Sequence, residues 1–287
     1  MKNQLLKCIS GLLTQLKDDY YYFSNHKLKR NSLHRYRVTF KELSALVNIA
    51  SYVSDKNFNS QNSMKKLRSL FKHAGNVRDL QVQIKMISAY EKTLELGYRD
   101  FELFCMNGIK KYKKKFILAI EEFRPEYFIK LLKTIKKTLK PISSKQMNER
   151  IIDLLKNKWE CLHHVVNIEV KNEEYHDFRT DLKQFSFVIQ FYSRYLCQDK
   201  RIIPIINNII SFETEIGSWH DKVVLINILG KYLRDKTDIS STDLQFRNKI
   251  IKDIHAFTYE FEKHKIMFEE SNDLFFELMK ENETLKI

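Results

Sequence analysis

A basic helical stripe occurs twice in the chain: residues 33–41 read LHRYRVTFK and residues 175–183 read YHDFRTDLK. Each stretch has a histidine, an arginine three positions later and a lysine seven positions later: His34, Arg37 and Lys41 in the first copy, and His176, Arg179 and Lys183 in the second. The copies are separated by 176 − 34 = 142 positions. On an α-helix these three positions fall within an arc of about 60°, so each set forms one basic stripe.

Apolar residues flank both stripes at helical spacing. In the first copy they are Leu33, Tyr36, Phe40, Leu43 and Val47, and in the second Phe178, Leu182, Phe185 and Ile189. A solvated helix face usually mixes acids and bases, because pairs of opposite charge four residues apart support each other. A stripe that is only basic and lies between apolar flanks predicts a groove between helices.

A second pair of motifs has the same offset. Residues 75–79 read GNVRD and residues 217–221 read GSWHD, again 142 positions apart. We expect Gly75 and Gly217 to end helices in the left-handed conformation. Asn76 and Ser218 would then cap the next helices, with Asp79 and Asp221 completing capping boxes. Arg78 and His220 would lie in a first helical turn, where backbone N–H groups favour anions.

Two motifs that share one offset predict a duplicated unit. We therefore expect one domain over residues 1–287, with repeat halves 1–142 and 143–287 that pack on each other. Glycine and proline are rare, with 6 and 3 residues in 287, and 43% of the chain is apolar. Such a composition disfavours a turn-rich β fold and predicts about ten to twelve helices. Breaks are expected near Ser24–Asn25, Asp55–Ser63, Gly75, Gly97, Arg124–Pro125, Pro141–Ser144, Asn167–Asn172, Asp199–Pro204, Gly217 and Thr237–Thr242.

The charge balance points to an anionic partner. Fifty Lys and Arg residues face 36 Asp and Glu residues, for a net charge of +14. Nucleic acid, an anionic membrane and other polyanions are all compatible with this excess. One predicted helix carries Lys130, Lys133, Lys137 and Lys140 opposite an apolar face, either as a solvated face or as a polyanion surface.

Several function classes lack their sequence signals. We find no secretory leader, no apolar run of about 18 residues, and no Cys-x-x-Cys pair, so we expect a cytoplasmic protein with reduced thiols. Phosphate-loop, hydrolase-elbow and zinc-protease motifs are also missing, and we expect no cofactor, no metal and no enzymatic activity. The dipeptides His176-Asp177 and His220-Asp221 leave a metal-dependent phosphohydrolase as a less favoured interpretation.

The four motifs resemble the CHAD family, the conserved-histidine α-helical domain that binds inorganic polyphosphate. The first family motif is matched by His34, Arg37, Val38 and Lys41, and the second by Leu67, Arg68, Gly75, Arg78, Asp79 and Leu80. The second half matches through His176, Arg179 and Lys183, and then through Gly217 and Asp221. The resemblance implies an all-α fold of two four-helix bundles related by pseudo-twofold symmetry, with a basic central cleft. It also implies a non-catalytic binding module, and whether the protein associates with polyphosphate granules in the cytoplasm is left open by the sequence.

The polyphosphate site expected on this basis consists of His34, Arg37, Lys41, Arg68, Lys72, Arg78, His176, Arg179, Lys183 and His220. His34 and His176 would gain charge below about pH 6.5, so acidification would strengthen binding. The chain departs from the family at positions where basic residues are common, which here are Glu42, Ser44, Gln184 and Ser186. The sequence is also compatible with a nucleic-acid-binding protein and with a structural adaptor that has lost its ligand.

Overall fold

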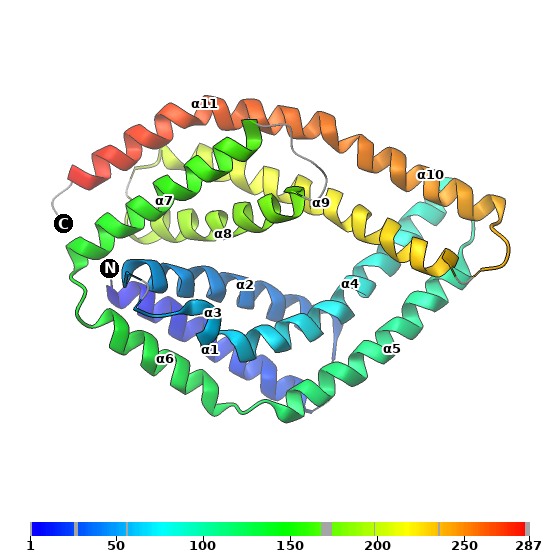
Figure 1. The fold of residues 1–287 in the computed structure, drawn as a ribbon, viewed down its shortest axis with the longest axis horizontal. Coiled ribbons are helices and arrows are strands. Elements are labelled where there is room, and N and C mark those ends of the chain that lie inside the picture. The colour runs from blue at the N-terminus through cyan, green and yellow to red at the C-terminus, as the bar shows by residue number, and fades with distance from the viewer. Residues whose placement is uncertain are drawn as a thin grey trace.

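The computed structural model describes residues 2–25, 28–55, 57–167, 174–197, 199–234 and 236–284. Within these ranges the chain forms helices and no β-strand, which confirms the predicted all-α class. The helices in chain order (Figure 1) are α1 (Lys2–Ser24), α2 (Arg30–Val53), α3 (Ser60–Ser63), α4 (Lys65–Leu94), α5 (Arg99–Glu122), α6 (Glu126–Leu139), α7 (Ser144–Asn167), α8 (Glu174–Tyr195), α9 (Ile202–Arg234), α10 (Ser241–His255) and α11 (Phe257–Thr284).

Local signals explain several helix boundaries. Before α7, the Gln146 N–H donates to Ser143 Oγ and the Ser143 N–H donates to Gln146 Oε1, both at 3.1 Å, which forms a capping box. After α4, Glu95 adopts the left-handed conformation with φ 52°, close to the break predicted near Gly97. The break predicted at residues 167–172 falls largely on residues 168–173, outside the described ranges.

Two predicted helix ends are wrong. Helices α4 and α9 continue without a break through Gly75 and Gly217, and no described glycine has a positive φ. The residues predicted to form caps and first turns after these glycines therefore lie in mid-helix: Asn76, Arg78, Asp79, Ser218, His220 and Asp221.

The glycines serve packing instead of termination. A Cβ atom at Gly75 would overlap the guanidinium of Arg37, which reaches across from α2. At Gly217, a Cβ atom would lie 4.0 Å from Nη2 of Arg179 on α8. In both halves the glycine therefore faces the arginine of the basic stripe, and the missing side chain at Gly75 lets the charged group approach the helix backbone.

Two pairs of helix starts are separated by the same offset as the sequence motifs. Helix α1 begins at residue 2 and α7 at residue 144, a difference of 142, and α5 and α10 begin at residues 99 and 241, again 142 apart. Figure 1 shows α1–α6 along one side of the molecule and α7–α11 along the other.

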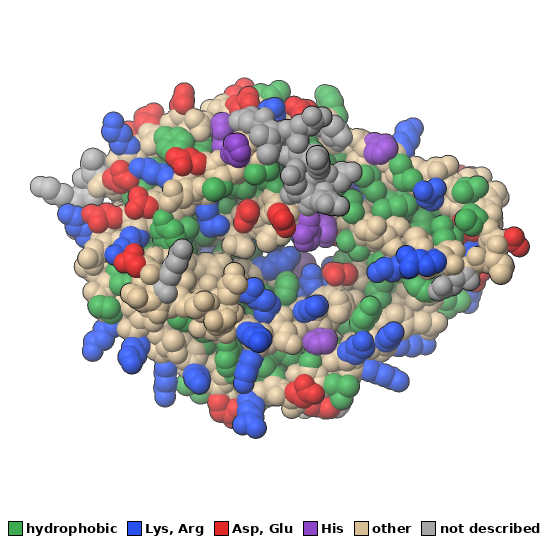
Figure 2. Space-filling model, in the orientation of Figure 1, with side chains coloured by type: hydrophobic (Ala, Val, Ile, Leu, Met, Phe, Trp, Pro, Cys, Tyr) green, Lys and Arg blue, Asp and Glu red, His purple; other side chains and the backbone are tan. Residues whose placement is uncertain are grey.

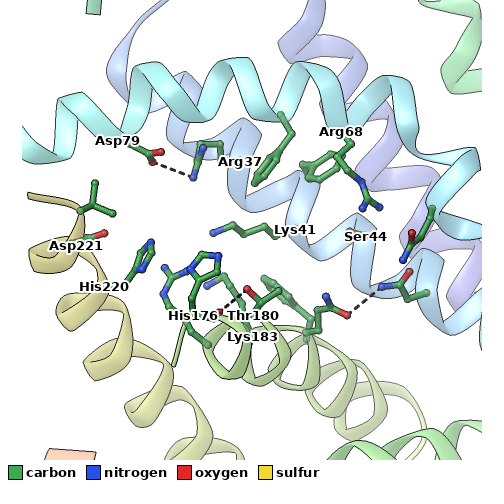
Figure 3. Close-up of a pocket in the computed structure, with 18 of the residues that line it drawn as sticks. Arg37, Lys41, Ser44, Arg68, Asp79, His176, Thr180, Lys183, His220 and Asp221 are labelled. Carbon is green, nitrogen blue, oxygen red and sulfur yellow. Dashed lines mark hydrogen bonds and ion pairs between the residues drawn. The ribbon is translucent and has the colours of Figure 1, made fainter. Parts of the chain in front are cut away.

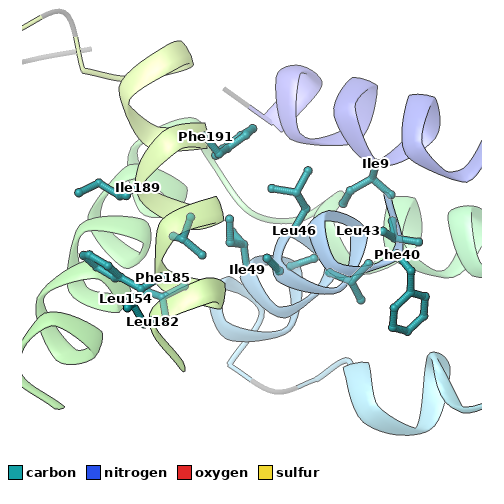
Figure 4. Packing of buried hydrophobic residues seen from close by; sticks show 14 of the residues in the cluster. Ile9, Phe40, Leu43, Leu46, Ile49, Leu154, Leu182, Phe185, Ile189 and Phe191 are labelled. Carbon is teal, nitrogen blue, oxygen red and sulfur yellow. The ribbon is translucent and has the colours of Figure 1, made fainter. Parts of the chain in front are cut away.

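The main hydrophobic core runs through both halves and continues across the junction of α2 and α8, which pack against each other. Figure 4 shows Leu46 and Ile49 of α2 on the side of α8, where Leu182 and Phe185 are also buried. Burying a side chain of this size stabilises the fold by about 1.5–3 kcal/mol. This junction holds the two basic stripes at a fixed separation.

A second core joins the halves at the far ends of α4, α5, α9 and α10, where Phe101, Leu229 and Phe246 are fully buried. Tyr98, the residue that precedes α5, donates a hydrogen bond to the buried Asp243 of α10. Burial raises the pKa of Asp243, but hydrogen bonds from neighbouring donors outweigh this effect. These bonds, with the one from Tyr98 as the strongest, lower the pKa to about 2. The halves are thus fastened at two separate junctions.

Candidate functional site

A cavity of about 550 Å³ lies between the halves. Its walls come from α2, α3 and α4 of the first half and from α8 and α9 of the second. The space-filling view shows a hollow near the centre of the face, with Lys, Arg and His side chains around it (Figure 2).

The charged side chains in this cavity are mainly cations. Two carboxyl groups, from Asp79 and Asp221, also line it. The cations are Arg37, Lys41, Arg68, Arg179 and Lys183. Figure 3 shows that Arg37 and Lys41 come from α2 and that Lys183 comes from the facing α8. The basic stripes of the two halves therefore converge on one cavity.

Arg37 is held in place by two neighbours, Asp79 and Phe71. Its Nη2 atom lies 3.3 Å from Oδ1 of Asp79, and its guanidinium lies 4.9 Å from the centre of the Phe71 ring. Phe71 in turn stacks on Phe40 at a centroid distance of 4.5 Å. The side chain keeps 18% of its surface exposed, so a positioned guanidinium still faces the cavity.

On the opposite wall, Lys183 forms an ion pair with Glu213 and lies 5.7 Å from the centre of the Phe187 ring. The Nε atom of Arg179 is buried and has no hydrogen-bond partner among the described residues. A buried donor without an acceptor is costly, and an anionic ligand would supply the missing acceptor.

The neighbouring cations of the cavity change the pKa of Lys41. Burial, followed by repulsion from Lys183, Arg179 and Arg37, lowers the pKa of Lys41 to about 7, and Asp79 opposes this only as the weakest influence. Repulsion of Lys41 by these cations indicates a region of positive potential, which a bound anion would relieve.

Burial also raises the pKa of both cavity carboxyl groups. For Asp79 this effect outweighs the opposing attraction of Arg37, and for Asp221 that of Arg179. The charge of Asp79 raises the pKa of Asp221 further. Their negative charge is therefore lost at a higher pH than that of ordinary aspartates, which lessens their repulsion of an anion as the pH falls.

The two cavity histidines lie close together, with His176 and His220 ring centroids 5.0 Å apart. Burial, together with Arg179, His176 and Lys41, lowers the pKa of His220 to about 4. Burial and the neighbouring cations, Arg78 first, also lower the pKa of His34. His34 and His220 therefore gain their positive charge at a lower pH than an ordinary histidine, and the neutral imidazole of His220 can donate one hydrogen bond.

Seven of the ten site residues expected from the sequence line the cavity: Arg37, Lys41, Arg68, His176, Arg179, Lys183 and His220. The other three, His34, Lys72 and Arg78, are not part of its lining. His34 and Lys72 are exposed, and Arg78 is partly buried in mid-helix. Burial, Arg30 and Arg37 lower the pKa of Arg78, and the nearby carboxyl groups of Asp221 and Asp79 oppose this shift.

Polar and aromatic residues of the cavity escaped the sequence analysis. Asn48 continues the α2 stripe fourteen positions after the histidine, so extending the helical spacing would have found it. The Asn48 amide donates to Gln184 Oε1 on α8 at 3.3 Å, linking the two walls. Gln83 and Phe71 come from α4 and carried no comparable signal in the sequence.

The described part of the chain gives no support to a metal centre. No group of three or more His, Cys, Asp or Glu side chains within it is placed to hold a metal ion. Nor does any helix in the same ranges have the length and apolar character needed to cross a membrane.

Comparisons with known proteins agree with this architecture. The model of the CHAD domain family matches residues 24–230. The crystal structure of the CHAD domain from the plant Ricinus communis has the same fold, with a TM-score of 0.70 and 13% sequence identity over 94% of this chain and 91% of that one. No match was found among curated proteins. Because the family model covers more than half of the chain, the protein belongs to the CHAD domain family.

Proposed function

We propose that the protein binds inorganic polyphosphate in the cavity between its halves and does not hydrolyse it. The observation that carries this proposal is the convergence of Arg37 and Lys41 from α2 with Arg179 and Lys183 from α8. Each arginine would bind phosphoryl oxygens through forked hydrogen bonds, and each lysine would act as a point charge.

The shape of the cation array favours a repeating anion over a single phosphate. The cations come from opposite walls and several of them repel one another, as the lowered pKa of Lys41 reflects. A chain with one negative charge per repeat can satisfy many such groups at once. Its affinity is then a sum of individually weak contacts that depends strongly on salt. Family membership supports the same ligand class, because the resemblance to CHAD domains implies polyphosphate.

The direct test replaces one arginine from each wall. We expect Arg37→Glu with Arg179→Glu to abolish binding of defined-length polyphosphate in calorimetric titrations at moderate salt. The matched control reverses Arg99 and Arg247, which are exposed and outside the cavity lining, and changes the net charge equally. Arg37→Gln with Arg179→Gln provides a second variant, since neutral amides place no new charge beside Asp79 and Asp221.

Circular dichroism would show whether each variant remains folded. Unchanged affinity in both cavity variants would reject the site, as would equal losses in the cavity and control variants. Competition with single-stranded RNA and heparin at matched salt tests the ligand class, and we expect polyphosphate to displace both. Release of orthophosphate during the titration would contradict the non-catalytic role.

The proposed cellular location follows from the ligand. We infer that the protein acts in the cytoplasm on polyphosphate granules. A fluorescent fusion should co-localise with stained granules, and the Arg37→Gln, Arg179→Gln variant should become diffuse. A wild-type fusion that stays diffuse in cells with visible granules would contradict this location.

A further inference from the structure

A row of four lysines runs along the outer face of α6. These residues, named here the lysine row, are Lys130, Lys133, Lys137 and Lys140. All four are exposed, whereas the opposite face of the helix is buried through Phe128, Leu131, Ile135 and Leu139. The helix is thus fixed by its apolar side and presents a mainly cationic side to solvent, with Glu126 as the acid of its first turn.

The lysine row has few acidic neighbours on its own helix. Among the described residues, none of its members forms an ion pair, and α6 itself has only one acid, Glu126 in its first turn. The second half differs, because acids of its last helix are paired with bases, as Glu277 is with Arg201 and Glu283 with Lys156. Four unpaired cations within about 15 Å of helix leave a local positive field that an extended anion complements.

Cations connect the cavity to the lysine row. Arg68 of α4 lines the cavity and is also exposed. Two residues closer to the start of α4, the ammonium of Lys66 lies 5.8 Å from the centre of the Tyr127 ring, which belongs to the first turn of α6. Lys65 is exposed beside it. Figure 2 shows Lys and Arg side chains projecting along the lower edge of the molecule, where Figure 1 places α6.

We propose that a polyphosphate chain too long for the cavity leaves it past Arg68, crosses the start of α4 at Lys66, and continues along the lysine row. This inference rests on the proposed function and extends it to the length of the polymer. Once one segment is held in the cavity, the next is kept at high local concentration beside the row, so weak contacts there increase the affinity for long chains alone. Inorganic triphosphate is too short to reach both surfaces.

The test compares two sets of substitutions with the same change in charge. Binding of inorganic triphosphate and of long-chain polyphosphate would be measured at two salt concentrations for the wild type and for both variants. The control lysines are exposed, lie in the second half and form no ion pair among the described residues. The row variant is Lys130→Gln, Lys133→Gln and Lys137→Gln, and the control variant is Lys231→Gln, Lys252→Gln and Lys263→Gln.

We expect the row variant to lose roughly tenfold in long-chain affinity. The slope of the logarithm of its affinity against the logarithm of the salt concentration should become shallower by about one for each lysine replaced. Its affinity for triphosphate should stay within about twofold, and the control variant should stay close to the wild type for both ligands. Equal losses in the two variants would reduce the effect to net charge and overturn the proposal. So would equal losses for triphosphate and long chains.

Two further outcomes separate this chain path from competing explanations. A wild type that binds neither ligand rejects the proposed function itself, whereas a wild type that binds both while the row variant is unaffected rejects only the chain path. Vesicles containing phosphatidylserine provide the membrane arm. If the row variant loses vesicle binding but keeps its long-chain affinity, the row is a membrane surface and the chain path is wrong.

Discussion

The pH dependence of ligand binding should be controlled by Lys41. Burial and repulsion from Lys183, Arg179 and Arg37 lower its pKa to about 7, so in the free protein this ammonium is mostly lost by pH 8. A bound phosphate places negative charge beside Lys41 and raises its pKa again. Binding above neutral pH must therefore take up a proton, and affinity falls as the pH rises.

The size of this effect follows from the shift. Where the free site is deprotonated and the bound site is protonated, affinity falls close to tenfold for each pH unit, which is about 1.4 kcal/mol. With a free pKa of about 7 and a bound pKa restored above 9, the loss between pH 7.5 and pH 9 is roughly 20-fold. This window avoids the carboxyl groups and His220, whose pKa of about 4 lies far below it.

Calorimetric titration with long-chain polyphosphate in two buffers of different ionisation enthalpy measures both the affinity and the number of protons taken up. We expect close to one proton per cavity near pH 8. Lys41→Arg keeps its charge throughout the window and should bind with nearly constant affinity, and Lys41→Met should bind more weakly and without pH dependence. A wild-type affinity that is flat from pH 7.5 to pH 9, with no buffer dependence, would refute the reasoning.

Three further predictions concern the helices that build the cavity. Gly75→Ala should displace Arg37 and lower polyphosphate affinity about fivefold to tenfold. Gly217→Ala should leave affinity unchanged and raise the free energy of unfolding by about 0.5–1 kcal/mol through helix propensity. Titration and urea unfolding measure both variants, and equal effects of the two substitutions would contradict the packing argument. Because the folded pKa of Lys41 lies below its unfolded value, wild-type stability should rise between about pH 7 and pH 10, and Lys41→Met should lose this rise and be more stable than the wild type at pH 6 by on the order of 2 kcal/mol, as urea unfolding would show. Asp243 has a folded pKa of about 2, so its contribution to the free energy of unfolding is present above about pH 4 and is lost as the pH falls toward 2. Asp243→Asn should lower the free energy of unfolding by about 2–4 kcal/mol at pH 7 and remove this acid dependence. An unchanged denaturation midpoint would exclude a role for the second junction.

The helical class and the convergence of the stripes could be predicted because both depend on local periodicity. Phe40 and Leu43 on one stripe, and Phe178 and Leu182 on the other, are buried as their spacing indicates. When the apolar sides of α2 and α8 are buried, the basic stripes beside them lie at the edge of the α2–α8 junction. Residues from two distant segments therefore lie together.

The glycine motifs show what a single sequence could not reveal. Gly75 followed by Asn76 has the composition of a helix end, and propensity alone favours that interpretation. The structure keeps the helix because its interior glycine makes space for Arg37, a residue 38 positions earlier in the chain. Close approach between distant segments leaves no periodic signal, so the same residue type fits both explanations until the fold is known.

The four departures from the family pattern have unequal consequences, and their positions explain why. Ser44 and Gln184 line the cavity, so their neutral side chains reduce its positive charge directly. Ser186 is 1% exposed and accepts a hydrogen bond from Gln190 at 3.0 Å, which leaves no room there for a cation directed at a ligand.

Glu42 lies in a separate cavity of about 220 Å³ on the α2–α8 junction, where burial raises its pKa and Arg194 opposes the shift. The positive charge of Arg194 therefore faces the carboxyl group of Glu42, which is not part of the main cavity lining. Only two of the four departures weaken the site itself. A cavity with fewer cations than the family pattern supplies makes cations outside it more important for long chains, and the unpaired lysines of α6 are placed to provide them.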